Sequence, residues 1–498
     1  MKSKKKKQQF WGGRLDESPE ILNLAYCAGR DVAVRPMADE VLVPYDCWQN
    51  KAHVLMLCRQ GIIKSSAAKR ILRALDQYEV LVAAGKRRLD SRKEDVHTNI
   101  EHYVAETESP EISGVMHTGR SRNDQSATVC RMFLRSRVLS YTAAVMGLIS
   151  ELLEFSAKNT TVVVGGYTHY QPACITTIGH WFSSHAEALL RDVERLLDCY
   201  ERINVSPLGA AASFGTGWPI DRELSAKLLG FDSVQANTLD CVTNRWEMEA
   251  DVAAQICFAM SHLSILAQDI VVLSSVHVGV LHIADRYVTG SSIMPQKRNP
   301  DFCEVTRAKA ALVEHLMATI FSIARGSLSG YNRDSQWTKY IIMDLLDEVK
   351  DAPTIFKGVF ETMRVNETRA KELAMSNFIN AVDVADALAI ETGWPFRKAY
   401  ELVSVAVKLC NDKGYIDLDV IKQLCAKEGV KELKLKVGTP LEIVENKTHT
   451  GGPAPKAVKK QIVTMKSLLS KSDKRLKKLI DNLDEARETL NKMSKALS

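Results

Sequence analysis

One short segment, Gly290–Pro300 (GSSIMPQKRNP), brings two adjacent hydroxyls, a cation and an amide together. Asn299 is a favourable N-cap residue and Pro300 suits the first position of a helix, so a helix is predicted to follow directly. The segment would then lie at the positive end of a helix dipole, to which Lys297 adds a full charge. Such a loop is suited to holding a carboxylate or to stabilising an anion that forms during a reaction. The alternative is a simple polar turn between two helices.

Two further segments are rich in hydrogen-bonding side chains. His117–Gln125 (HTGRSRNDQ) comes just before a predicted long helix, and donors at a helix N-terminus suit a dicarboxylate. Gly330–Lys339 (GYNRDSQWTK) lies between two predicted helices, and three of its side chains could reach a polar substrate: Tyr331, Gln336 and Lys339. The structural alternatives are a capped helix start with solvated arginines for the first segment and an interhelical turn for the second.

His169 is the histidine, among twelve, whose surroundings indicate chemistry. It follows Thr168 within Gly166–Pro172, a turn bounded by glycine and proline from which a side chain can project into a cleft. Histidine is the side chain best suited to exchanging protons near neutral pH. Since a single histidine is more often structural, the assignment depends on the other three segments.

Size and composition are those of a large globular protein. The chain has 498 residues, of which 46% are hydrophobic and 25% charged. The net charge of +6 is mostly local, because five lysines lie within the first seven residues of a tail (1–9) expected to be disordered. The most apolar run, 270–283, is too short and polar to span a membrane, and no secretory signal is predicted. Eleven scattered cysteines without a Cys-x-x-Cys pattern indicate a reducing, cytoplasmic compartment and no zinc site.

Helical periodicity dominates the chain. Five long segments carry the pattern: 127–158, 178–202, 246–283, 301–325 and 337–364. Long helices in succession indicate a bundle. The third is apolar on more than one face, which requires burial on several sides, so an oligomer with helices packed between subunits is predicted. After a turn-rich stretch at 448–455, leucines at helical spacing among lysines predict an amphipathic C-terminal helix.

Together these segments resemble argininosuccinate lyases of the fumarase/aspartase superfamily, across nearly the whole chain. Further stretches that match are Phe10–Arg14, Pro219–Arg222, Asn237–Asp240, Asn380–Asp386 and Gly451–Pro455. The resemblance implies an all-α, three-domain fumarase/aspartase-like fold, with a central long-helix bundle shared across a homotetramer. The implied parts are an N-terminal helical domain, a central five-helix domain, a C-terminal helical domain and an amphipathic helical extension, at residues 1–121, 122–369, 370–463 and 464–498.

The resemblance also implies an activity, the elimination of arginine from argininosuccinate with release of fumarate, which is the last step of arginine biosynthesis and uses no metal or organic cofactor. Ser291 would be the base, activated by nearby positive charge and amides, and Lys297 would stabilise the anion. His169 would protonate the leaving nitrogen, unless the roles of His169 and Ser291 are reversed. The implied substrate contacts are Asn123, Thr168, Tyr331, Gln336, Lys339, Arg122, Ser292 and Asn299. The expected partners are the substrate and further copies of the chain, with neither nucleic acid nor membrane.

Three positions depart from the family pattern. Gln49–Asn50 replaces a Gly-Ser pair whose serine contacts substrate, Cys174–Ile175 replaces a second Gln-Pro pair, and Asn244–Trp246 replaces an acidic pair around an arginine. These changes concern the amino-acid half of the substrate more than the elimination chemistry. Two alternatives therefore stay open, a related carbon–nitrogen lyase acting on another N-substituted aspartate and a catalytically silent, crystallin-like structural protein. An additional RNA- or membrane-binding role for the lysine-rich ends could coexist with catalysis.

Overall fold

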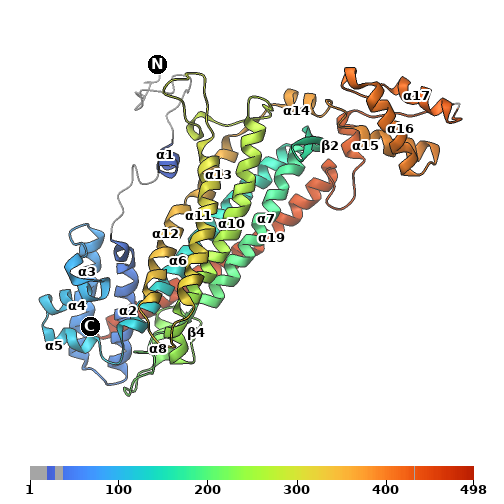
Figure 1. The fold of residues 1–498 in the computed structure, drawn as a ribbon. Helices are drawn as coiled ribbons and strands as arrows, with labels where there is room; N and C mark the ends of the chain where they lie inside the picture. The colour runs from blue at the N-terminus through green and yellow to red at the C-terminus, as the bar shows by residue number, and fades with distance from the viewer. Residues whose placement is uncertain (1–19, 29–36, 431, 498) are drawn as a thin grey trace.

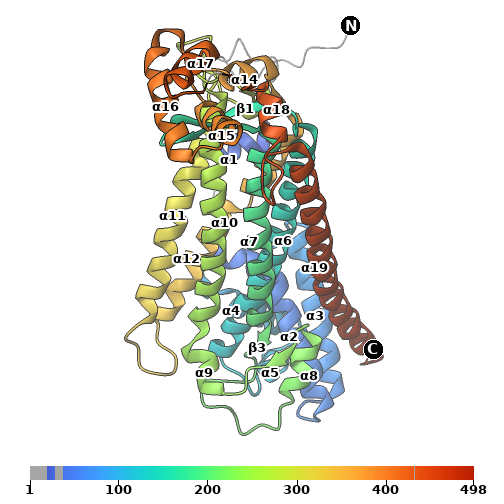
Figure 2. The ribbon, with the colours of Figure 1, turned by 90° about the vertical axis from the view of Figure 1, so that its right-hand side faces the viewer.

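The computed structural model describes residues 20–28, 37–430 and 432–497. The predicted basic tail and the Phe10–Arg14 stretch lie outside these residues. The described chain consists mostly of helices, with three two-stranded sheets. Long helices form an elongated bundle, and shorter helices gather at each of its ends (Figures 1 and 2). The all-α class expected from the sequence is confirmed.

Six helices build the described bundle: α6 (Arg122–Lys158), α7 (Ile178–Ile203), α10 (Arg245–Ser274), α11 (Asp301–Ala324), α12 (Asp334–Val349) and α13 (Ala352–Thr362). α6 packs on α7 and α13, while α10 packs on α7, α11 and α12. Three rings meet where α6, α7 and α13 converge, since the centroids of Phe155, Phe182 and Phe360 lie 5.3–5.4 Å apart. Such mutual edge-on packing fixes the helices against one another.

Two of the predicted helices differ from the structure. The helix expected over 246–283 ends at Ser274, after which β5 (Leu281–His282) pairs with β6 (Arg364–Val365). The helix expected over 337–364 is two helices, because Pro353 lacks an amide hydrogen and is accommodated in the first turn of a new helix, α13.

One end of the bundle carries the N-terminal helices (Figure 2). They are η2 (Ala38–Leu42), α2 (Val43–Arg59), α3 (Ser65–Ala83), η3 (Ser91–Lys93), α4 (Val96–Thr107) and α5 (Pro110–Met116). The same end holds α8 (Arg222–Leu228), α9 (Thr238–Thr243) and the parallel pair β3 (Val205–Ser206) and β4 (Ser233–Val234). Trp48 of α2 contacts α8, since its Nε1 donates a hydrogen bond to the Leu228 carbonyl oxygen at 3.0 Å. Only α1 (Ile21–Ala28) lies away from this group, against α11.

The opposite end carries the hairpin of β1 (Val163–Thr168) and β2 (Gln171–Thr177) and the short η4 (Asp285–Tyr287). The C-terminal elements there are α14 (Glu367–Leu373), α15 (Ala381–Thr392), α16 (Phe396–Leu409), η5 (Asn411–Lys413), α17 (Leu418–Lys427) and α18 (Pro440–Glu445). From this end α19 (Pro455–Leu497) runs back along α7 and α6 to the N-terminal helices (Figures 1 and 2). The predicted amphipathic extension is the continuation of this single helix.

Candidate active site

The segment Gly290–Pro300 forms a closed loop between α10 and α11. Thr289 and Asn299 make an antiparallel bridge, whose backbone hydrogen bonds of 3.0 and 2.9 Å join the two ends of the loop. Asn299 is not the predicted N-cap of α11, because its Nδ2 donates to the Gly290 carbonyl oxygen at 3.4 Å and Pro300 holds the cap position without a side-chain hydrogen bond. The bridge turns the Asn299 side chain back toward the loop and away from the helix amides.

Ser291 lies within this loop, and its hydroxyl meets two backbone amides. The amide of Met294 donates to Ser291 Oγ at 3.0 Å and that of Ile293 at 3.3 Å. The amide of Lys297 in turn donates to the Met294 carbonyl oxygen at 3.1 Å, which closes a turn. Two amides directed at one oxygen stabilise it when it is negatively charged. The geometry therefore favours the deprotonated serine that a base requires.

Arg298 fixes the base of the loop. Its guanidinium forms an ion pair with Asp285 and donates to the Ile283 carbonyl oxygen at 2.7 Å. By contrast, residues 292–297, which include Ser292 and Lys297, are exposed. A loop with a fixed base and an exposed tip is suited to closing over a bound substrate.

Thr168 and His169 lie at the tip of the β1–β2 hairpin. Thr168 pairs with Gln171, and His169 and Tyr170 form the two-residue turn with φ angles of 54° and 59°. Positive φ at both positions matches the twist of the flanking strands. All three residues from Thr168 to Tyr170 are exposed. His169 thus projects outward from an ordered turn, where a second molecule can reach it.

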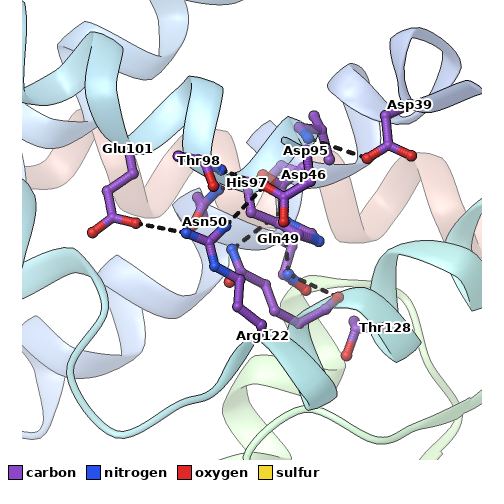
Figure 3. Close-up of polar contacts among 12 residues, drawn as sticks. Asp39, Asp46, Gln49, Asn50, Asp95, His97, Thr98, Glu101, Arg122 and Thr128 are labelled. Atoms are coloured by element: carbon purple, nitrogen blue, oxygen red, sulfur yellow. Dashed lines mark hydrogen bonds and ion pairs between the residues drawn. The ribbon is translucent and has the colours of Figure 1, made fainter. Parts of the chain in front are cut away.

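The predicted substrate residues Arg122 and Asn123 form the first turn of α6. Ser121 caps this helix by accepting a hydrogen bond from the Asn123 amide at 3.3 Å. The Arg122 guanidinium pairs with Asp95 and Glu101, each at 3.1 Å (Figure 3). These two carboxylates hold the Arg122 guanidinium beside the N-terminus of α6.

A buried polar network lies beside this turn, with Asp46 of α2 at its centre (Figure 3). The Nδ1 of His97 lies 2.8 Å from Asp46 Oδ1, and Asn50 Nδ2 donates to Asp46 Oδ2 at 3.1 Å. Burial raises the pKa of Asp46, but His97, Arg120 and Arg122 outweigh it and hold the pKa below its ordinary value. Asp46 is therefore ionised at neutral pH and balances the cations around it.

Asn50 uses its whole side chain inside this network. Its Nδ2 also donates to the Asp46 carbonyl oxygen at 2.9 Å, and its Oδ1 accepts a hydrogen bond from Arg120. The residue is 1% exposed. The neighbouring Gln49 donates to the Gln125 carbonyl oxygen at 3.3 Å. At this departure from the family pattern, Asn50 orients Arg120 and does not face solvent.

Tyr331, Gln336 and Lys339 lie at the start of α12, at the same end of the bundle as Asn123 (Figure 2). The Tyr331 hydroxyl donates to Gln336 Oε1 at 3.3 Å. Lys339 is buried, with its Nζ 2.6 Å from Asp39 Oδ1. Tyr331 is exposed and Gln336 is half-buried, so a ligand can reach both, whereas Lys339 belongs to a buried ion pair with Asp39.

Sequence reasoning missed the buried acids that support this end. Burial raises the pKa of Asp124 to about 6 and that of Glu249 to about 7, against the lowering effect of hydrogen bonds and of neighbouring cations such as Arg245. The sequence feature that could have identified them is an acidic residue on the apolar face of a helix, because a buried carboxylate requires a partner. Among the described residues, no group of three or more His, Cys, Asp or Glu side chains could hold a metal ion.

The chain separates its predicted site residues into two groups at opposite ends of the bundle (Figures 1 and 2). His169 and Ser291 lie at one end, and Asn123 and Tyr331 lie at the other. α6 connects the two ends with 37 residues, or about 55 Å at the usual helical rise. No small substrate can bridge that distance, so a site that uses both groups must combine more than one copy of the chain.

Comparisons with known proteins define the class first. The family described as "Lyase" matches residues 45–314. The crystal structure of EDDS lyase in complex with formate superposes with a TM-score of 0.84 at 28% identity, covering 97% of this chain and 96% of that one. Class II fumarase from Schistosoma mansoni shares the fold, with a TM-score of 0.68 at 17% identity over 84% and 94% of the two chains. The fold is that of the fumarase/aspartase superfamily of lyases.

Closer relatives define the family. The family described as "Argininosuccinate lyase C-terminal" matches residues 378–435. The argininosuccinate lyase of Methanocaldococcus jannaschii is 34% identical, over 91% of this chain and 94% of that protein. The argininosuccinate lyase of Pelotomaculum thermopropionicum is 36% identical, over 90% and 96%. The chain belongs to the argininosuccinate lyase family, which confirms the predicted resemblance.

Proposed function

We propose that this protein is an argininosuccinate lyase, which splits argininosuccinate into arginine and fumarate in the biosynthesis of arginine. The observation that carries the proposal is the Ser291 hydroxyl with two amides directed at it, in a chain that matches argininosuccinate lyases over at least nine-tenths of its length. The other readings, another N-substituted aspartate as substrate or a silent structural protein, are not favoured.

In the proposed mechanism, Ser291 acts as an alkoxide and removes a proton from the carbon next to a carboxylate. The electron pair that remains spreads into this carboxylate, which becomes doubly negative. Lys297 and the loop amides stabilise that charge as it develops, which is the main route to a lower barrier. The bond from carbon to the guanidino nitrogen then breaks, the double bond of fumarate forms, and His169 gives a proton to the departing nitrogen, directly or through water.

The remaining polar residues would hold the substrate in position. We assign this role to Asn123, Thr168, Tyr331, Gln336, Lys339, Arg122, Ser292 and Asn299. Arg122 and the first amides of α6 suit a carboxylate. Lys339 would act from its buried position by fixing the electrostatics of the site through its pair with Asp39.

We also propose that the active site is assembled from several chains of a homotetramer. Support comes from the two separated groups of site residues and from an uncovered apolar surface. Phe258 and Ile265 of α10 are 49% and 57% exposed, and Leu312 and Phe321 of α11 are 42% and 48% exposed. Large exposed apolar side chains on two adjacent helices are typical of an interaction site. If neighbouring bundles pack in opposite directions along this surface, one chain's Ser291 end meets another chain's Asn123 end.

The proposed location is the cytoplasm, without binding to membranes or nucleic acid. By length and composition alone, α6 and α10 could cross a membrane, with 61% and 44% of their most apolar stretches buried. The uncovered part of α10 is the surface assigned above to other subunits. Light scattering on the purified protein tests this assignment, since the mass of four chains supports it and a monomer contradicts it.

A substrate comparison tests the proposed reaction. The purified protein would be given argininosuccinate, adenylosuccinate and ethylenediamine disuccinate, and fumarate would be followed by its absorbance. We expect the highest kcat/KM with argininosuccinate. A preference for either of the other compounds would overturn the proposed substrate, and no release of fumarate from any would overturn the proposed reaction.

A further inference from the structure

The loop 207–219 presents two aromatic side chains to which the mechanism gives no role. Phe214 is 79% exposed and Trp218 is 52% exposed. Two large rings within five residues leave considerable apolar surface in water, which is unfavourable unless a ligand or a partner covers it.

A buried carboxylate holds the backbone of this loop in a strained form. Ala211 and Ser213 have φ angles of 52° and 90°, in the left-handed region that residues with side chains rarely adopt. Asp124 Oδ2 accepts hydrogen bonds from the amides of Gly209 and Ala211, both at 2.9 Å. Backbone strain of this kind persists where the surroundings impose it, and it is concentrated at functional sites. Since Asp124 directly follows Asn123, the loop is fixed relative to the start of α6.

The loop lies between the two substrate-binding segments of this end. On one side, a Cβ built on Gly119 would lie 3.6 Å from Trp218 Cβ and 3.8 Å from its Cδ1. On the other side, a Cβ built on Gly330 would lie 3.7 Å from Ser213 Oγ. Trp218 therefore lies beside the segment 117–125, and Ser213, which directly precedes Phe214, lies beside the segment 330–339.

We propose that Phe214 and Trp218 are specificity-determining residues that stack on the guanidino group of the substrate's amino-acid half. The inference rests on the proposed function, since that substrate carries such a group. A guanidinium is planar, delocalised and weakly hydrated, and it stacks readily on aromatic faces. The fumarate half is a dianion without a planar cation, so it gains nothing from these rings. The pair would thus select among N-substituted succinates without taking part in proton transfer.

The test compares Trp218→Ala, Phe214→Ala, the conservative Trp218→Phe and a control, Tyr415→Ala, whose ring is 56% exposed in the C-terminal region. Each variant would be assayed for kcat and KM with argininosuccinate, for the Kd of arginine by calorimetry and for the inhibition constant of fumarate. We expect Trp218→Ala to raise the KM and the arginine Kd by about tenfold, between the effects of an exposed and a desolvated cation–π contact, with the inhibition constant of fumarate unchanged. Trp218→Phe should recover most of the loss, and Tyr415→Ala should match the wild type.

Three results would overturn the inference. The first is an arginine Kd that neither alanine variant changes. The second is an equal weakening of arginine and fumarate, which would indicate a general disturbance of the site. The third is dissociation of the oligomer in either variant, which would show that the rings pack between subunits. If the wild type releases no fumarate, the proposed function fails separately, and the calorimetry with arginine still decides the role of the rings.

Discussion

The backbone amide of Met294 donates a hydrogen bond to the Ser291 hydroxyl oxygen at 3.0 Å. A serine hydroxyl is too weak an acid to lose its proton readily near neutral pH, so a donor directed at Oγ bears directly on its use as a base. Through this hydrogen bond, a local turn closed by Lys297 and Met294 would influence the removal of the substrate proton by Ser291.

Replacing Met294 with proline removes this donor while leaving the Ser291 side chain in place. We expect kcat to fall by about 10²-fold, as when one donor to an oxyanion is lost, and the rise of kcat/KM with pH to move to higher pH because the alkoxide is less stable. Met294→Ala keeps the amide and should retain the wild-type pH profile. A Met294→Pro enzyme whose pH profile matches that of the alanine variant would show that the amide does not activate Ser291.

Truncating Asn50 should destabilise the fold. Asn50→Ala leaves groups of Arg120 and Asp46 buried without this partner, and we expect the free energy of unfolding to fall by about 1–3 kcal/mol. The control is Asn491→Ala on the exposed face of α19, which should change it by less than about 0.5 kcal/mol. Urea denaturation measures the free energy of unfolding of both variants. Equal denaturation midpoints for Asn50→Ala and Asn491→Ala would mean that the Asn50 contacts contribute nothing to stability.

Glu249 should make the fold less stable as the pH rises. Its pKa of about 7 in the folded chain lies above the ordinary value of 4.5, so the folded state binds this proton more tightly than the unfolded state. The contribution is therefore present below pH 4.5 and is lost as the pH rises toward 7. Glu249→Gln cannot titrate at this position. As the pH rises through this window, its free energy of unfolding should therefore increase relative to that of the wild type, by up to about 3 kcal/mol.

The matched control is Glu247→Gln, an exposed carboxylate on the same helix. The difference between its free energy of unfolding and that of the wild type should stay constant between pH 5 and pH 7.5. If the Glu249→Gln difference is just as constant, Glu249 does not titrate in this range.

Mixing two inactive variants should restore activity. Ser291→Ala and Asn123→Ala damage opposite ends of the same chain, so in a mixed oligomer some sites combine two undamaged ends. Co-expression with two affinity tags would isolate mixed oligomers, and we expect lyase activity well above that of either variant alone. Two differently tagged Ser291→Ala chains serve as the control and should stay inactive. Without recovery in the mixed oligomer, the site would have to be built from one chain.

Local signals were enough to predict much of the fold. Three helices predicted over 127–158, 178–202 and 301–325 begin and end within five residues of α6, α7 and α11, because periodicity and capping are local properties. Pro353 is also a local signal, but the apolar periodicity on both sides of it suggested one helix. The prediction of Asn299 as an N-cap was wrong for a different reason, since its bridge to Thr289 depends on the path of the whole loop.

The site was only partly predictable. The four polar segments of the candidate site were selected by residue type, since they combine hydroxyls, amides and cations in turns. Their supporting partners were not found, because Asp46, His97 and Asp39 reach the site only through tertiary packing. The distance between the two groups of predicted site residues follows from the lengths of the helices, which the sequence pattern predicts. That the two groups lie at opposite ends of the bundle becomes clear only when the path of the chain is known.

A product assay on purified wild-type protein and Ser291→Ala tests the proposed reaction and its base together, with fumarate followed by absorbance and arginine by amino-acid analysis. We expect equal yields of fumarate and arginine from argininosuccinate, and turnover at least about 10³-fold slower in the variant, since the base is removed. Undiminished turnover in Ser291→Ala, or a folded wild-type oligomer that releases neither product, would contradict this expectation.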